Sequence, residues 1–277
     1  GVLEHSMVME EFWRADPGVG CVLLANFGSE IIQKFGTEDQ KKLYLPEIAE
    51  GRAIWSTAIT EPNAGSDIFG QTTTARQDGP KYYISGSKQF ITNGTIANYV
   101  LVMCRTNPDH PDRFKRHGFF VVKRGAPGFE STKLSGKMGI RASDTAALSF
   151  DEVEVPAESL IGKVEGQAFA QVMHLFNINR VVAAAQGVGV AQAALDRALD
   201  YVRKRVQFGK TLASFQGVQY SLAEMESKIE AGRQMYRLAA WQIDNGKIDP
   251  KTISVAKLLA GQTAVWVTQE ALQLHGG

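Results

Sequence analysis

The sequence has little of the side-chain chemistry that builds disulfide frameworks and metal centres. It holds two cysteines among 277 residues, Cys21 and Cys104, and neither belongs to a CxxC pair. Five histidines are scattered along the chain, and no HExxH pattern occurs. These shortages argue against a disulfide scaffold and a structural zinc site, and they give metal catalysis no support.

An excess of one charge and a long apolar run are also missing. Lysine and arginine number 30 against 29 aspartate and glutamate residues, which leaves a net charge of +1. Such a balance creates no field that would attract nucleic acid or an anionic membrane. No apolar run approaches the roughly 20 residues that cross a bilayer.

Common nucleotide-binding and hydrolase motifs do not occur either. The segment nearest to a dinucleotide-binding GxGxxG loop is Gly187–Gln192, which lacks the third glycine and a preceding strand. Because it lies within a helical pattern, its glycines are predicted to serve helix packing. No Walker loop and no GxSxG elbow are present.

The period of the apolar residues divides what remains into three zones. Residues 1–53 follow a helical pattern and are predicted to be the end of an N-terminal helical domain. Residues 54–165 carry short aromatic and β-branched runs, which predict a central β domain. Residues 166–277 return to helical spacing and predict long antiparallel helices in an incomplete C-terminal domain. The predicted fold class is therefore α+β with several domains.

Local signals place the elements within these zones. Thr37–Gln40 reads as a capping box that opens a helix over Gln40–Glu50, and Gly51 is predicted to close it. Asp16 followed by Pro17 is a predicted cap and first helical position. Further predicted strands are Lys81–Gly86, Lys88–Thr92, Tyr99–Met103, Gly118–Val122 and Ala146–Phe150, and the last of these leads to Val153–Pro156 as a predicted strand end. Further predicted helices are Phe169–Arg203, Gly217–Asn245 and Pro250–Leu274.

Five short blocks combine glycine turns with hydroxyl, aromatic and cationic side chains. In chain order they are Ala58–Asp67 (AITEPNAGSD), Lys88–Gly94 (KQFITNG), Lys137–Thr145 (KMGIRASDT), Arg205–Gly209 (RVQFG) and Gln273–Gly277 (QLHGG). Together they resemble the signatures of the acyl-CoA dehydrogenase family, and the resemblance covers nearly the whole chain. It implies a helical segment, a central β-barrel or β-sandwich domain and a C-terminal antiparallel helix bundle.

The resemblance also implies an activity. The cofactor would be FAD and the substrate an acyl-CoA thioester, which undergoes α,β-dehydrogenation to the 2-enoyl-CoA. Electrons would pass to an electron-transfer flavoprotein. The implied assembly is a homotetramer in which each FAD site is shared across a dimer, with no nucleic acid and no membrane span. The implied compartment is the bacterial cytoplasm or the mitochondrial matrix, although a targeting segment cannot be assessed.

A flavin ring needs hydrogen-bond donors at its N5 and O4 edge and an apolar wall on one face. By resemblance, the first block runs along the ring, the second lies across its other side, and Ser66 contacts both flavin and substrate. The cofactor-binding residues implied in this way are Thr57, Ala58, Ile59, Thr60, Ser66, Phe90, Ile91 and Thr92. The alternative is that both blocks are ordinary strands and turns with threonines at half-buried edges.

A second group is implied to bind the FAD of a neighbouring subunit. An arginine can pair with pyrophosphate and an aromatic ring can stack on adenine. Arg205 and Phe208, spaced three apart, are expected to share a helix face before Gly209. The alternative is a helix C-terminus with a dipole-favoured arginine and a Schellman glycine. This group consists of Arg205, Phe208, Gln216, Gln273, Gly276 and Gly277.

The substrate thioester is implied to contact Ser66, Phe176, Asn177 and Arg180. Many relatives have an aspartate where this chain has Asn177. The alternative for Arg180 is a structural salt bridge within the helix.

The motifs do not assign the catalytic base to a residue of this chain. In most relatives it is a Glu about twenty residues beyond the Gln273–Gly277 block, and in a minority it precedes the arginine, where this chain has Asn179. The chain therefore resembles a piece truncated at both ends, and as given it is expected to be inactive or nearly so. Asp16 or Glu11 is the candidate substitute in an unusual member, and the alternative is that they are a helix cap and a surface charge. The alternative functions are a flavin-dependent oxidase or monooxygenase on the same fold, or a non-catalytic family member.

Overall fold

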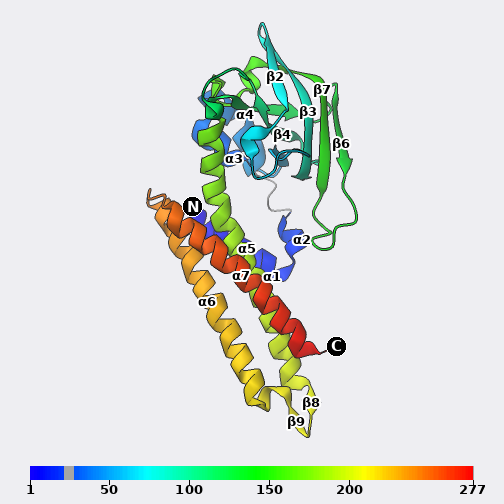
Figure 1. Ribbon diagram of the computed structural model, residues 1–277, viewed down its shortest axis with the longest axis vertical. Coiled ribbons are helices and arrows are strands. Elements are labelled where there is room, and N and C mark those ends of the chain that lie inside the picture. The colour runs from blue at the N-terminus through cyan, green and yellow to red at the C-terminus, as the bar shows by residue number, and fades with distance from the viewer. Residues whose placement is uncertain (22–27, 277) are drawn as a thin grey trace. The chain divides into compact units, whose positions relative to one another are not determined.

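A computed structural model describes residues 1–21 and 28–276 of the chain. Helices, strands and helices again follow one another along the chain, as predicted (Figure 1). The first run comprises α1 (Val2–Ala15), α2 (Pro17–Gly20), α3 (Ser29–Phe35) and α4 (Glu38–Ala49). The second comprises β1 (Trp55–Ala58), β2 (Thr74–Asp78), β3 (Lys81–Thr92), β4 (Tyr99–Arg105), β5 (His117–Lys123), β6 (Phe129–Lys133) and β7 (Thr145–Pro156). The third comprises α5 (Ala168–Lys204), β8 (Val206–Gln207), β9 (Lys210–Thr211), α6 (Gln216–Asp244) and α7 (Pro250–His275).

The described residues form two compact units. We call residues 21 and 28–175 the sheet unit, and residues 1–20 and 176–276 the helical unit. The division of the sequence at residues 53 and 165 stays a prediction. No described helix combines the length and the apolar character that crossing a membrane requires.

The capping signals in the sequence are confirmed. The Thr37 side chain accepts a hydrogen bond from the Gln40 N–H at 3.3 Å, and the Gln40 side chain accepts one from the Thr37 N–H at 3.0 Å. These reciprocal bonds satisfy two amide donors that the first turn of α4 would otherwise leave free. Gly51 follows the helix at φ 69°, a conformation that glycine adopts without a steric penalty.

The seven strands of the sheet unit form one curled, mixed sheet in the order β1-β4-β2-β3-β7-β6, with β5 also paired to β4. β1 and β4 run parallel, whereas β3 is antiparallel to both β2 and β7. Two strands were expected over residues 81–92, but β3 is continuous and interrupted only by register shifts between Ile84 and Gly86 and between Lys88 and Ile91. Bulges can bend a strand without ending its pairing, so a single strand carries both predicted segments.

Aromatic rings join α4 to the first strands of this sheet. The ring centroids of Trp55 and Tyr99 lie 4.9 Å apart in a stacked arrangement, and Tyr44 meets Trp55 edge-on at 5.2 Å. Residues 100–104 of β4 are buried on both faces, as their continuous apolar run predicts. The start of β1 is thereby fixed in the core, and the strand leads from there to the predicted flavin segment.

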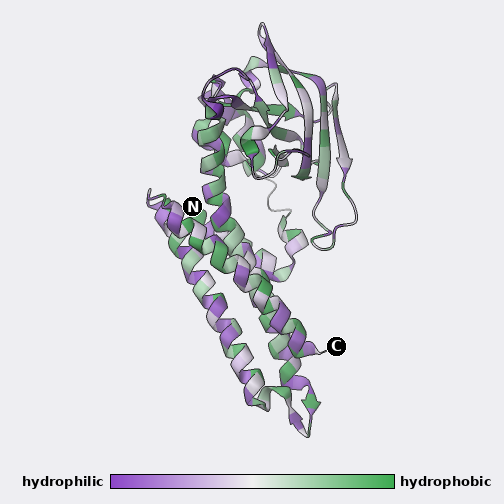
Figure 2. Ribbon diagram, in the orientation of Figure 1, coloured by the Kyte–Doolittle hydropathy of each residue, from purple (hydrophilic) through white to green (hydrophobic). Residues whose placement is uncertain are grey.

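Small residues allow the helices of the helical unit to approach closely. Apolar and polar residues alternate along α6 and α7, as in helices with one buried face (Figure 2). A Cβ atom on Gly187 would lie 3.1 Å from the Ala260 carbonyl oxygen, and one on Gly189 would lie 2.2 Å from that of Glu10. The predicted packing role of these glycines is confirmed.

We expect Gly189→Ala to destabilise the protein by about 1–3 kcal/mol, because the added methyl group overlaps the backbone of α1. Gly261→Ala is the matched control, since its Cβ would have only the end of Lys257 near it, at 4.0 Å. Removing a glycine from an open helix position stabilises by about 0.5–1 kcal/mol. Urea unfolding of both variants measures the difference. Equal midpoints would contradict the close approach.

Candidate functional site

The two segments predicted to contact a flavin lie side by side in the sheet unit. The Ser56 hydroxyl donates to the Thr92 carbonyl at 2.6 Å, and the Gln89 N–H donates to the Thr60 carbonyl at 2.9 Å. Thr57, Ala58 and Ile59 are buried, whereas the side chains of Thr60 and Thr92 are half-buried. The family resemblance implied this apposition, but no local pattern indicates it, because it joins residues about 30 positions apart.

Phe90 presents an exposed ring from a backbone that few residues adopt. Its φ is 60°, and 65% of the residue is exposed, while Ile91 next to it is buried. A positive φ is costly for a bulky residue and persists where the surrounding structure enforces it. Such outliers occur often at ligand sites. An exposed aromatic wall beside two threonine hydroxyls fits a flat ring with polar edges.

Ser66 lies two residues beyond a tight turn that follows the first segment. Glu61 and Ala64 exchange backbone hydrogen bonds of 3.0 and 3.2 Å, which close the turn. Ser66 itself is exposed and lies next to Asp67, which pairs with Arg113 at 3.1 Å. No hydrogen bond joins Ser66 to the segments around Thr60 and Phe90 among the described residues, and its shared role stays a prediction.

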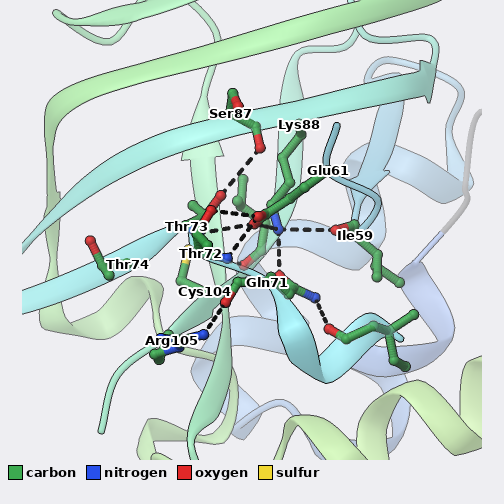
Figure 3. A network of polar contacts seen from close by, with 12 residues as sticks. Ile59, Glu61, Gln71, Thr72, Thr73, Thr74, Ser87, Lys88, Cys104 and Arg105 are labelled. Carbon is green, nitrogen blue, oxygen red and sulfur yellow. Dashed lines mark hydrogen bonds and ion pairs between the residues drawn. The ribbon is translucent and has the colours of Figure 1, made fainter. Parts of the chain in front are cut away.

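A closed polar network lies beneath the two segments (Figure 3). The Lys88 ammonium donates to the Ile59 carbonyl at 3.0 Å, to the Glu61 carboxylate at 3.0 Å and to the Gln71 side-chain oxygen. The same carboxylate accepts from the Thr72 and Thr73 N–H groups at 2.7 and 3.0 Å. The side chains of Lys88 and Glu61 are 0% and 2% exposed.

Burial and neighbouring charges shift the pKa values of Glu61 and His117 in this region. Burial alone raises the pKa of Glu61, but the Lys88 charge and the Thr72 and Thr73 donors outweigh it and lower the pKa to about 2. Burial and the neighbouring Arg105 and Lys88 cations lower the pKa of His117 from 6.5 to about 4. Both His117 ring nitrogens are buried without a hydrogen-bond partner. The histidine is therefore held neutral at neutral pH.

Three of the four predicted thioester residues, Phe176, Asn177 and Arg180, lie together on α5 in the helical unit, whereas Ser66 belongs to the sheet unit. Arg180 donates to the Asn177 side-chain oxygen at 3.0 Å, and its guanidinium carbon lies 5.9 Å from the Phe176 ring centroid. Arg180 also lines a groove of about 690 Å³ beside α7. No carboxylate pairs with Arg180 among the described residues, which leaves part of its charge available to a ligand.

The geometry expected for Arg205 and Phe208 is wrong. Helix α5 ends at Lys204, and β8 and β9 then form a hairpin whose two turn residues, Phe208 and Gly209, have φ values of 52° and 74°. Two left-handed residues are what a type I′ hairpin turn requires. Phe208 is 94% exposed at this tip, so it shares no helix face with Arg205, and Gly209 is not a Schellman cap.

The remaining members of that group occupy the ends of α6 and α7. Gln216 donates to the Tyr220 hydroxyl at 2.9 Å. Gly276, at φ 85°, donates its N–H to the Gln273 carbonyl at 3.1 Å, while Gly277 lies outside the described residues. Arg205 and His275 line one groove of about 1010 Å³. The structure thus brings Arg205 and His275 of α7 together, whereas Phe208, Gln216, Gln273 and Gly276 do not line this groove.

The predicted substitute bases have structural partners. Asp16 accepts from the Gly18 and Val19 N–H groups at 2.7 and 3.0 Å, so it caps α2. Glu11 is exposed and pairs with Arg14 at 3.6 Å. A catalytic role for either stays a prediction. No cluster of metal-binding side chains occurs in the part of the chain that the structure describes.

Sequence reasoning missed the importance of Glu61, Lys88 and Gln71. Lys88 is the only charged residue in its block, and Glu61 precedes a proline turn. These positions carried a weak signal, because a charge in a predicted strand is usually solvated. Only the fold shows that the two charges meet in the core.

Three models of one family match the chain consecutively. They are described as the N-terminal domain of acyl-CoA dehydrogenase over residues 1–52, its middle domain over 56–153 and its C-terminal domain over 166–277. Among curated proteins, the chain is 39% identical to an acyl-CoA dehydrogenase of Bacillus subtilis and 40% identical to a short-chain-specific acyl-CoA dehydrogenase of Megasphaera elsdenii. It is 38% identical to an acryloyl-CoA reductase (NADH) of Anaerotignum propionicum. Each match covers all of this chain. It covers 73% of the Bacillus subtilis protein, 72% of the Megasphaera elsdenii protein and 70% of the Anaerotignum propionicum protein.

Solved structures resemble the chain over nearly its whole length. Butyryl-CoA dehydrogenase from Megasphaera elsdenii has a TM-score of 0.96 and 38% identity, covering 100% of this chain and 72% of that one. A chain in a structure of the electron transferring flavoprotein of Acidaminococcus fermentans has a TM-score of 0.93 and 39% identity, covering 97% and 70%. An FAD complex of PigA has a TM-score of 0.93 and 30% identity, covering 100% and 73%.

The pKa values of this site predict how stability depends on pH. Because His117 has a lower pKa in the folded chain than its ordinary 6.5, stability is full above pH 6.5 and falls as the pH drops toward 4. Glu61, lowered from 4.5 to about 2, adds a second loss between those values. We expect His117→Phe to flatten the decline between pH 6.5 and 4 in urea unfolding. His110→Phe, at a half-buried loop position, is the control and should leave the decline unchanged. An unaltered slope in His117→Phe would contradict the assignment.

Proposed function

The chain belongs to the acyl-CoA dehydrogenase family, and on that premise we propose that it catalyses FAD-dependent α,β-dehydrogenation of an acyl-CoA thioester to the 2-enoyl-CoA. The observation that carries the proposal is the apposition of residues 57–60 with residues 90–92. It creates one surface with an exposed aromatic ring and half-buried hydroxyl groups. Bound FAD supplies the acceptor for the hydride that leaves the substrate.

The sheet unit would hold the flavin ring. Thr60 and Thr92 present small hydroxyl side chains that can donate to a polar ring edge, and Phe90 offers an apolar wall. Thr57, Ala58, Ile59 and Ile91 would line the approach, and Ser66 would contact the cofactor or the substrate from beyond the turn. The buried backbone behind these residues keeps water away from one side of the ring.

The helical unit would hold the rest of the ligands. Arg180, with Asn177 and Phe176, would bind and orient the thioester end of the substrate through a cation that has no carboxylate partner in the described chain. A second set would bind the FAD of a neighbouring subunit within a homotetramer. It consists of Arg205, Phe208, Gln216, Gln273, Gly276 and Gly277.

Relatives guide the choice of substrate and electron partner. Two of the reported proteins are named for short-chain or butyryl substrates, so we propose a short acyl-CoA as the first to test. An electron-transfer flavoprotein is the proposed acceptor. The expected compartment, the bacterial cytoplasm or the mitochondrial matrix, stays a prediction.

A second candidate function is the reverse reaction, reduction of a 2-enoyl-CoA. The relative named acryloyl-CoA reductase favours it. Both directions use the same bonds and the same geometry at the reacting carbons, so the site residues would be shared. The acceptor or donor that restores the cofactor would decide the direction.

Anaerobic titration of the full-length, FAD-loaded protein with straight, branched and cyclic acyl-CoAs tests the proposal. We expect the visible flavin absorption to bleach with one class, butyryl-CoA being the first to try. Failure of every thioester to bleach bound FAD would contradict dehydrogenation. Rapid reoxidation of the bleached protein by air would instead indicate an oxidase, and bleaching by NADH followed by recovery with an enoyl-CoA would indicate the reductase.

Arg180→Met tests the substrate contact. Hydrogen bonds to charged groups contribute about 1.5–3 kcal/mol, so we expect the dissociation constant for the acyl-CoA to rise about ten-fold or more. The affinity for FAD should be unchanged. Arg203→Met, an exposed arginine on the same helix, is the control. If both variants bind the thioester like the original protein, Arg180 is a structural residue.

A further inference from the structure

The backbone around Phe90 departs from the alternation of a regular strand. Side chains two positions apart on a strand point to the same face. Lys88 and Phe90 nevertheless differ completely in exposure, since the Lys88 side chain is fully buried and Phe90 is 65% exposed. The pairing of β3 with β7 shifts between Lys88 and Ile91. Lys88 lies opposite Leu148, and Ile91 lies opposite Ala146. Three steps on β3 match two steps on β7, which is a β-bulge.

The buried end of this bulge is anchored by charge. Lys88 directs its three ammonium protons to three acceptors, two of them in the first flavin segment and the turn that follows it (Ile59 and Glu61) and the third at Gln71. Glu61 in turn accepts from the N–H groups of Thr72 and Thr73 and from the Thr72 hydroxyl at 2.9 Å. Every member of the set is satisfied, so a displacement of Lys88 would leave a buried charge without a partner.

One of these acceptors belongs to the first flavin segment itself. The Ile59 carbonyl receives a Lys88 proton, and the next carbonyl, that of Thr60, receives the Gln89 N–H. Two adjacent residues of the first segment are therefore bound to two adjacent residues of β3. Both bonds lie immediately before Phe90, so they fix where its ring and the Thr60 side chain stand relative to each other.

We infer that the buried Lys88–Glu61 pair positions the flavin-binding surface, by holding the bulge that turns Phe90 outward and by aligning the Thr60 segment with it. The inference rests on the proposed function, because it takes this surface to be the one that meets the flavin. Buried ion pairs often add little stability compared with apolar residues of similar volume. A role in geometry therefore explains this pair better than a role in stability.

The test is the double variant E61Q/K88M. It removes both charges together, so neither is left unpaired; the single amide oxygen can still accept from Thr72, while the Thr73 N–H, which bonds the other carboxylate oxygen, loses its acceptor. We expect the variant to remain folded, while the dissociation constant for FAD rises at least about ten-fold. The visible spectrum and midpoint potential of bound FAD should shift as well. Without any cofactor, hydrogen exchange at the Gln89 amide should become faster.

The matched control is K81M/E154Q. Lys81 on β3 and Glu154 on β7 pair at 2.6 Å across the two strands that form the bulge, and both side chains are about half exposed. The charge change is the same, but no proposed flavin residue is attached to this pair. Affinity for FAD and the spectrum of the bound cofactor should be unchanged in this variant.

The outcomes separate the inference from the proposed function. If E61Q/K88M is folded, binds FAD with the original affinity and leaves the spectrum unchanged, the inference is overturned, whatever the activity. If the original protein binds FAD but no thioester reduces it, the proposed reaction fails while the comparison of affinities still stands. An original protein that binds no FAD would overturn both.

If E61Q/K88M does not fold, the variant Q71M replaces it in the test, since it removes one of the three acceptors of Lys88. A loss of affinity of about three-fold is then expected, and no loss overturns the inference.

Discussion

A buried ammonium group that must find three oxygen acceptors is the constraint on which the site in the sheet unit depends. Taking Lys88 and Glu61 out of water is costly, and only complete hydrogen bonding compensates for it. The partners come from Ile59, Glu61 and Gln71, which lie 29, 27 and 17 residues from Lys88 along the chain. Satisfying one side chain therefore fixes the end of the first strand, the turn after it and the start of the segment that leads to β2.

Because its two charges are paired, the network adds no net charge beneath the proposed flavin surface. The positive and negative groups neutralise each other below the surface, where water cannot screen them. Above them stand the hydroxyl groups of Thr60 and Thr92 and the ring of Phe90. A neutral surface with fixed donors can meet the polar edge of a ring without competing charges, and the strain at Phe90 is borne by the pairing beneath it.

The helical unit relies on a different physical principle. Glycine and alanine at the helix contacts let the backbones approach until a single added methyl group would overlap, as at Gly189. This unit also has a largely buried ion pair of its own, in which Glu10 of α1 accepts from Arg233 of α6 at 2.8 Å and from the Tyr236 hydroxyl. The bond between Arg180 and Asn177 is local to α5, where the proposed thioester side chains are half-buried, whereas Arg205 and Phe208 lie beyond the end of that helix and are exposed.

The sequence by itself determined the features that depend on neighbours a few residues away. The capping box at Thr37, the glycine stop at Gly51 and the three long helices follow from local spacing, and the ordered motifs identified the family. Tertiary structure alone decided the burial of Lys88, the bulge before Phe90 and the hairpin at Phe208, where a helix face was expected. The physical reason is that burying a charge or enforcing a positive φ depends on distant groups that the fold brings together. A local pattern contains no information on whether those partners will be present.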